Sequence, residues 1–108
     1  MNLEESIVEA LGKVKAYDII SIDTKEKSPF YDEMVVASVS SMRQVSAVIT
    51  YITEEVEKNG FKVRAVEGKE TPWVIVDCYD IIVLIFTEEE RKRVSIEKIY
   101  TDTLNKQL

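Results

Sequence analysis

The stretch of residues 73–86 constrains the fold more than any other part of the sequence. It contains two β-rich runs, residues 73–76 and 81–86, on either side of a short polar break, and this pattern is typical of an antiparallel hairpin. The second run has six apolar residues without alternation, which predicts a strand in the middle of a sheet with both faces covered. Helices from elsewhere in the chain must therefore pack on this sheet.

The polar break at residues 77–80 determines what the hairpin presents. It lacks the Asn-Gly or Asp-Gly pair of a tight primed turn, so we expect a type I turn that begins at Asp77, or a slightly longer loop. The strand period of two places Trp73, Ile75 and Asp77 on one face and the residues between them on the other. An aromatic ring and a carboxylate are therefore expected on the same side of the sheet.

Three helices are predicted from apolar spacing and capping residues. They cover residues 3–15, residues 41–59 and the segment from residue 87 onward. Their capping pairs are Asn2 with Glu5, Ser41 with Gln44 and Thr87 with Glu90. The charge run at residues 88–93 suits the electrostatic polarity of a helix better than a binding patch. The first helix can pack its apolar stripe on the core or present it to a partner, and core packing is the simpler interpretation.

Three further strands are predicted at residues 18–23, 34–39 and 61–67. Residues 95–100 show helical spacing, and the last residues are expected to fray. The long helix between the second and third strands permits a right-handed crossover. The predicted fold is therefore a single α/β (α+β) domain over residues 1–108, with a mixed five-stranded sheet and helices packed on it.

The charge balance narrows the classes of partner. The chain has 14 Lys and Arg against 20 Asp and Glu, a net charge of -6. A nucleic-acid binder needs a basic footprint, so we expect no direct sequence-specific nucleic-acid binding and a basic protein as the better partner. No apolar run approaches the roughly 20 residues of a membrane span, and Glu4, Glu5 and Glu9 stand where a secretory signal would be basic. These features predict a cytoplasmic protein without membrane association.

The residue types present exclude several kinds of active site. The sequence has no histidine and a single cysteine, Cys78, which excludes histidine-based acid-base catalysis, an internal disulfide and a cysteine metal cluster. Its three glycines do not form a phosphate-binding spacing. Asp77 and Asp80 form a pair of carboxylates that suits a metal or acid-base work, but turn residues that cap backbone groups are the simpler interpretation. Trp73 is likewise either a hairpin-packing residue or a binding anchor. We predict no catalytic, cofactor or metal site.

Several segments match one family pattern in order and spacing. Residues 15–19 read Lys-Ala-Tyr-Asp-Ile, residues 32–39 read Asp-Glu-Met-Val-Val-Ala-Ser-Val, and residues 41–45 read Ser-Met-Arg-Gln-Val. Further matches are Asp23, Glu67-Gly68, Trp73, Asp77, Asp80, Phe86 and the segment Ile-Glu-Lys-Ile-Tyr at residues 96–100. Together they cover almost the whole chain and resemble the ribosomal silencing factor family, also called RsfS or Iojap-like.

The resemblance implies a function without catalysis. It implies a sheet related to the nucleotidyltransferase fold but without that class's metal-binding aspartates, and the sequence has no Asp-x-Asp. It also implies a homodimer that binds the large-subunit ribosomal protein of the uL-fourteen family on the 50S subunit, blocks subunit joining and represses translation under nutrient limitation, with no cofactor. The partner-binding residues expected from it are Trp73, Asp77, Asp80, Tyr100, Asp32, Arg43 and Gln44.

The sequence departs from the family pattern at five positions, Glu33, Val39, Tyr79, Leu84 and Val94. Each replacement still suits its strand, turn or helix, so the departures bear on the partner-binding face and not on the fold. The alternative hypothesis is a nucleotide-handling enzyme of the related fold that holds a metal with the two aspartates of the hairpin turn. The missing Asp-x-Asp and the lack of a Gly-Ser loop before the second helix weigh against it.

Overall fold

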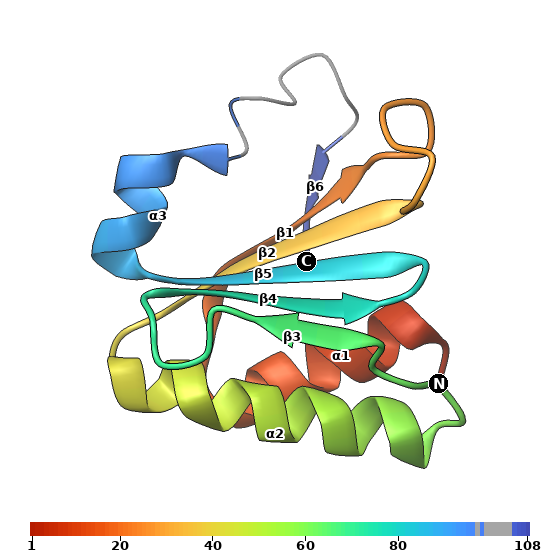
Figure 1. Ribbon diagram of the computed structural model, residues 1–108, viewed down its shortest axis with the longest axis horizontal. Coiled ribbons are helices and arrows are strands. Elements are labelled where there is room, and N and C mark those ends of the chain that lie inside the picture. Colours follow the sequence, from red (N-terminus) through yellow and green to blue (C-terminus); the bar gives the residue numbers. More distant parts are fainter. Residues whose placement is uncertain (97, 99–104) are drawn as a thin grey trace.

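A six-stranded mixed sheet forms the centre of the molecule (Figure 1). The computed structural model describes residues 1–96, 98 and 105–108. In chain order the elements are α1 (Leu3–Lys13), β1 (Tyr17–Asp23), β2 (Glu33–Val39), α2 (Met42–Lys58), β3 (Ala65–Glu67), β4 (Trp73–Cys78), β5 (Ile81–Thr87), α3 (Glu88–Val94) and β6 (Asn105–Gln107). The strand order is β3-β4-β5-β2-β1-β6, in which β2 and β5 are parallel and all other neighbours are antiparallel. The predicted α/β class with a mixed sheet is confirmed.

The sheet contains one strand more than the sequence predicted. Residues 105–107, which lie in the segment expected to fray, pair with β1, and Leu108 donates its N–H to the carbonyl of Ile19 at 2.8 Å. The five-strand count was wrong because three polar residues carry no periodic signal of their own. Their strand conformation depends on backbone pairing with a distant part of the chain.

Strand β3 is shorter than the predicted span of residues 61–67. Ala65 pairs with Asp77, and β4 ends one residue beyond that position. Residues 61–63 therefore have no strand opposite them. Phe61 and Val63 pack instead, partly buried, against the core beneath the sheet.

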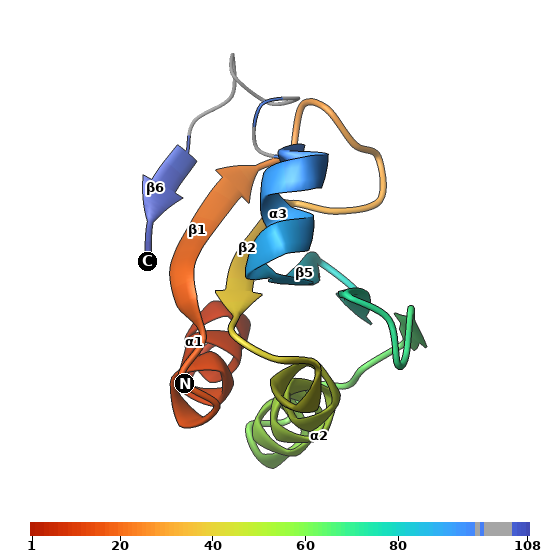
Figure 2. The same ribbon diagram turned by 90° about the vertical axis from the view of Figure 1, so that its left-hand side faces the viewer.

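Two apolar clusters cover the two faces of the sheet. Helices α1 and α2 lie on one face and α3 lies on the other (Figure 2). The larger cluster lies under α1 and α2. The smaller cluster lies on the opposite face, where α3 packs beside β5 and β2. Its buried members are Ile22, Met34, Val36, Leu84 and Phe86. Strand β5 is in the middle of the sheet and is buried on both faces, as its continuous apolar run predicted.

The predicted N-cap residues accept the expected backbone N–H at all three described helix starts, but only the first of these helices has a complete capping box. Asn2 forms a complete capping box with Glu5, and Thr87 accepts the N–H of Glu90 at 3.4 Å. At the start of α2, Ser41 accepts the N–H of Gln44 at 3.3 Å. The Gln44 side chain accepts the N–H of Ser40 at 2.8 Å and donates to the carbonyl of Val14 at 2.9 Å. Gln44 therefore joins the start of α2 to the end of α1.

A buried carboxylate joins the two large helices a second time. Glu55 on α2 is almost fully buried and pairs with Lys13 of α1, while Lys58 lies 3.6 Å from its other oxygen. The hydrogen bond from Lys13 holds the pKa of Glu55 below the ordinary value of 4.5. Removal of the lysine leaves a buried charge without its main partner, which destabilises a fold.

The Lys13→Met variant should therefore have a lower Tm than the parent at pH 7. A depressed folded-state pKa contributes stability above pH 4.5, and this stability is lost as the pH falls through the folded-state pKa. The deficit of the variant should accordingly shrink between pH 5 and pH 3. Thermal unfolding followed by circular dichroism across that range measures it, and Lys58→Met, at the longer distance, should show a smaller deficit. A Tm deficit that does not change with pH would contradict this assignment.

Candidate functional site

The tip of the β4–β5 hairpin is a two-residue turn. Cys78 pairs with Ile81, so only Tyr79 and Asp80 lie between the strands. Tyr79 has a φ of 72°, the left-handed conformation that tight primed turns require at this position. The prediction of a type I turn or a longer loop was therefore wrong. Asp77 stabilises the turn, because its Oδ1 accepts the N–H of Tyr79 at 2.9 Å.

The Asp77 carboxylate also organises the side chains around the tip. Its Oδ2 accepts from Arg64 Nε at 3.1 Å and Nη2 at 3.0 Å, and from the Tyr31 hydroxyl at 3.2 Å. The Arg64 guanidinium lies 4.8 Å from the centroid of the Tyr79 ring. Asp77 thus holds two side chains from separate segments of the chain, and one of them, Arg64, lies over the Tyr79 ring.

The electrostatics of this cluster agree with its geometry. The hydrogen bond to Asp77 raises the pKa of the Arg64 guanidinium. Burial raises the pKa of the Tyr31 phenol above 10.0, and the negative charge of Asp77 raises it further. Both side chains therefore keep their protons at neutral pH and remain donors to the carboxylate. A direct pair between Asp77 and a partner's lysine or arginine would have to displace Arg64.

Trp73 lies at the opposite end of β4 on the same sheet face as Asp77. The alternation of burial along β4 confirms the predicted facing, with Trp73, Ile75 and Asp77 partly exposed. Asp77 lies four positions along the strand from Trp73, a distance of about 13 Å. The Trp73 ring stacks on Phe86 with the centroids 5.0 Å apart. Its indole Nε1 is buried without a hydrogen-bond partner.

The face around Trp73 carries further apolar side chains that are only partly buried. Ile75 lies two residues along β4, and Ile82 on β5 pairs with Asp77. We call Trp73, Ile75 and Ile82 the Trp73 strip. The strip leads from the end of the sheet near α3 to the Asp77 cluster. It provides an apolar surface that ends in charged and phenolic groups.

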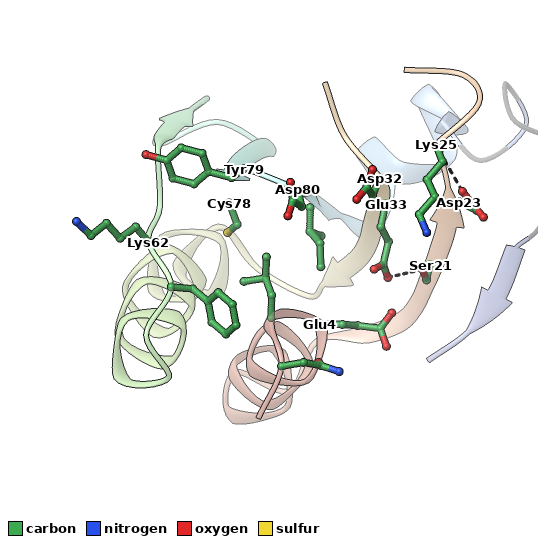
Figure 3. A pocket seen from close by; sticks show the side chains of 14 residues that line it. Glu4, Ser21, Asp23, Lys25, Asp32, Glu33, Lys62, Cys78, Tyr79 and Asp80 are labelled. Carbon is green, nitrogen blue, oxygen red and sulfur yellow. Dashed lines mark hydrogen bonds between the residues drawn. The ribbon is translucent and has the colours of Figure 1, made fainter. Parts of the chain in front are cut away.

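Asp32 and Asp80 lie together on the wall of a cavity of about 570 Å³ beside the hairpin tip (Figure 3). They precede the parallel strands β2 and β5, and the Asp80 carbonyl accepts the N–H of Asp32 at 2.8 Å. The cavity also borders the start of α1, where Glu4 lies. Its lining contains five carboxylates and two lysines, so its charge is mainly negative.

The structure therefore divides the predicted partner-binding residues into groups. Asp32 and Asp80 share the cavity wall, whereas Asp77 and Trp73 lie on the sheet face that bears α3. Exposed Arg43 and the bridging Gln44 lie in the first turn of α2. The last predicted residue, Tyr100, lies outside the described residues. Sequence reasoning missed Phe30, Tyr31, Arg64 and Tyr79 as members of the site.

The site offers little for metal or nucleophilic chemistry. In the described part of the chain, no three His, Cys, Asp or Glu side chains are placed to hold a metal ion. Both oxygens of Asp77 accept hydrogen bonds from protein donors, which disfavours a cation there. Burial raises the pKa of the Cys78 thiol to about 12, so it behaves as a small buried hydrophobe. Among the described helices, none is long and apolar enough to cross a membrane.

A family model decides the relationship to known proteins. The model described as "Ribosomal silencing factor during starvation" matches residues 2–108. The chain belongs to this family. The ribosomal silencing factor RsfS of Haemophilus influenzae is 36% identical over 101 residues, which is 93% of this chain and 99% of the relative. The RsfS of Bacillus subtilis is 33% identical over 82% of this chain and 75% of the relative.

Solved structures confirm the fold of this ribosomal silencing factor. A crystal structure of a Chromobacterium violaceum protein has a TM-score of 0.84 and 31% identity, and covers 93% of this chain and 87% of the other. A crystal structure of a Bacillus halodurans protein has a TM-score of 0.83 and 25% identity, and covers 98% and 97% of the two chains. The resemblance to the ribosomal silencing factor family, which the sequence motifs indicated, is therefore confirmed over nearly the whole length of the chain.

Proposed function

We propose that this ribosomal silencing factor binds the large-subunit ribosomal protein of the uL-fourteen family and thereby prevents the small subunit from joining. Its family membership supports a ribosome-silencing role. Repression of translation under nutrient limitation follows if the joined ribosome cannot form. A protein that acts by occupying a surface needs no catalytic group, and we accordingly propose a non-enzymatic factor that works in the cytoplasm without a cofactor.

The partly exposed Trp73 strip is the main support for the proposed binding surface. Aromatic side chains are enriched among interface residues that contribute most to affinity. The aromatic ring of Trp73 lies beside two isoleucines, on the only face of β4 that α1 and α2 do not cover in the described part of the chain (Figure 2). The net charge of -6 favours encounter with a basic ribosomal protein. Asp77 supports this face by fixing Arg64 and Tyr31 at its far end.

Co-sedimentation tests this proposal. The factor should pellet with isolated large subunits and with neither small subunits nor assembled ribosomes, because the proposed surface is covered once the subunits join. Equal recovery with assembled ribosomes would contradict the joining-block model. We also propose a homodimer, as the family resemblance implies; the apolar stripe of α1 is not available for it, because Ile7, Ala10 and Leu11 are buried in the core. Light scattering at roughly tens of micromolar, the range of a weak dimer, should show twice the chain mass, and a monomer would exclude it.

A further inference from the structure

Two large aromatic side chains are exposed beside the hairpin tip. Phe30, in the loop between β1 and β2, is 74% exposed, and Tyr79 is 46% exposed. Phe30 contacts Tyr31 edge to face, with the ring centroids 6.5 Å apart. Tyr31 reaches Asp77, which binds Arg64, and Arg64 covers Tyr79. We call Phe30, Tyr31, Arg64 and Tyr79 the tip row.

Hydrogen bonds within the chain hold the backbone that carries the tip row. The Asp80 carbonyl accepts the N–H of Asp32 at 2.8 Å, and the Asp77 carbonyl accepts the N–H of Arg64 at 2.8 Å. Thr24 donates its N–H to the backbone carbonyl of Asp32 at 3.0 Å, which closes the loop that carries Phe30. A surface whose side chains are already fixed loses less conformational entropy on binding. Exposed aromatic rings on such a surface are typical of an interaction site.

The charges near the tip row indicate the chemistry of its occupant. Arg64 is neutralised by Asp77, so its positive charge is not available to a phosphate. Carboxylates outnumber lysines in the adjoining cavity, and both Asp32 and Asp80 are exposed on its wall. Aromatic faces attract lysine and arginine side chains through cation–π contacts, and nearby carboxylates form charge-assisted hydrogen bonds with them. Nucleic acid would meet repulsion from the same carboxylates.

We infer that the tip row binds a lysine- and arginine-rich segment of a protein partner. The inference rests on the proposed function in one respect, because it names the surface on which a basic part of the ribosomal partner lies. The row also continues the Trp73 strip, since Tyr31 and Arg64 both bind Asp77 at the end of that strip. The two surfaces together form one footprint, apolar at Trp73 and selective for cations at the hairpin tip.

Two single variants test the tip row without disturbing the core. Phe30→Ala removes the most exposed ring of the row, and Tyr79→Gly removes a ring at a positive φ that glycine adopts without strain. Each should weaken binding to isolated large subunits at least about fivefold, the smallest effect expected of an important interface residue. Tyr51→Ala, which removes another exposed tyrosine, from α2, is the matched control and should bind like the parent.

The outcomes separate this inference from the proposed function. If the parent binds large subunits and both variants bind equally well, the tip row is not a contact and the proposed function stands. If the parent fails to bind, the proposed function is wrong, and a fluorescent ten-residue arginine peptide tests the row alone by anisotropy. The peptide should then bind the parent more tightly than either variant. The inference would be overturned if the parent bound a ten-nucleotide oligouridine more tightly than the peptide. It would also be overturned if Phe30→Ala converted a dimer to a monomer without changing subunit binding.

Discussion

Replacement of Trp73 by alanine should weaken binding to isolated large subunits about thirtyfold or more, which corresponds to roughly 2 kcal/mol. The ring is partly exposed, stacks on Phe86 and lies in line with Ile75 on a sheet face that is incompletely covered. Its truncation removes the largest apolar contact that this face can make. The buried Nε1, which has no hydrogen-bond partner in the structure, is lost without breaking any internal hydrogen bond.

Two controls separate binding from folding in the Trp73 experiment. Trp73→Phe keeps a ring that stacks on Phe86 and should retain the parent's circular dichroism while binding about fivefold more weakly. Met42→Ala removes another exposed apolar side chain, from α2, and should leave the affinity unchanged. If Trp73→Ala and Trp73→Phe both fold and both bind with the parent's affinity, the Trp73 strip is not the binding surface.

Substitution of Gly68 by alanine should destabilise the fold by at least about 2 kcal/mol. Gly68 has a φ of +82°, and a Cβ added there would lie 2.2 Å from the carbonyl oxygen of Trp73. The left-handed conformation alone costs an alanine about 1–2 kcal/mol. The clash adds to this cost, because a backbone oxygen at the start of β4 cannot move without shifting the strand that carries the binding surface.

The other two glycines provide matched controls for Gly68. Gly60 also has a positive φ, +90°, but open space around the Cβ position, so Gly60→Ala should cost only the conformational term of about 1–2 kcal/mol. Gly12 lies in α1 with nothing near its Cβ position, so Gly12→Ala should stabilise by about 1 kcal/mol. Urea unfolding of the three variants measures their free energies of unfolding. Equal losses of this free energy in Gly60→Ala and Gly68→Ala would show that the clash at Gly68 is relieved.

The elements that sequence analysis predicted correctly are those with a local signal. The continuous apolar run of β5, the alternation along β4 and the caps of the three helices all depend on residues close together in the chain. Strand β6 has no such signal, because it depends on pairing with β1 from the other end of the sequence. The two-residue hairpin turn was missed because Tyr79 adopts a conformation that its residue type disfavours.

The candidate site was predicted less completely for a similar reason. Asp77 and Trp73 were placed on one face by strand periodicity alone, and the structure confirms it. The partners of Asp77, in contrast, lie 13 residues away at Arg64 and 46 residues away at Tyr31. No short-range pattern indicates such contacts. They follow only from the pairing of β3 with β4 and from the loop that ends at the hairpin tip.

We propose that this ribosomal silencing factor keeps the subunits apart by occupying the large one. Light scattering during mixing of large and small subunits measures joining directly. An excess of the factor over large subunits should suppress the rise in scattering, and the Trp73→Ala variant at the same concentration should restore it. This proposal would be contradicted if the scattering rose normally while co-sedimentation showed that the factor was bound to the large subunits.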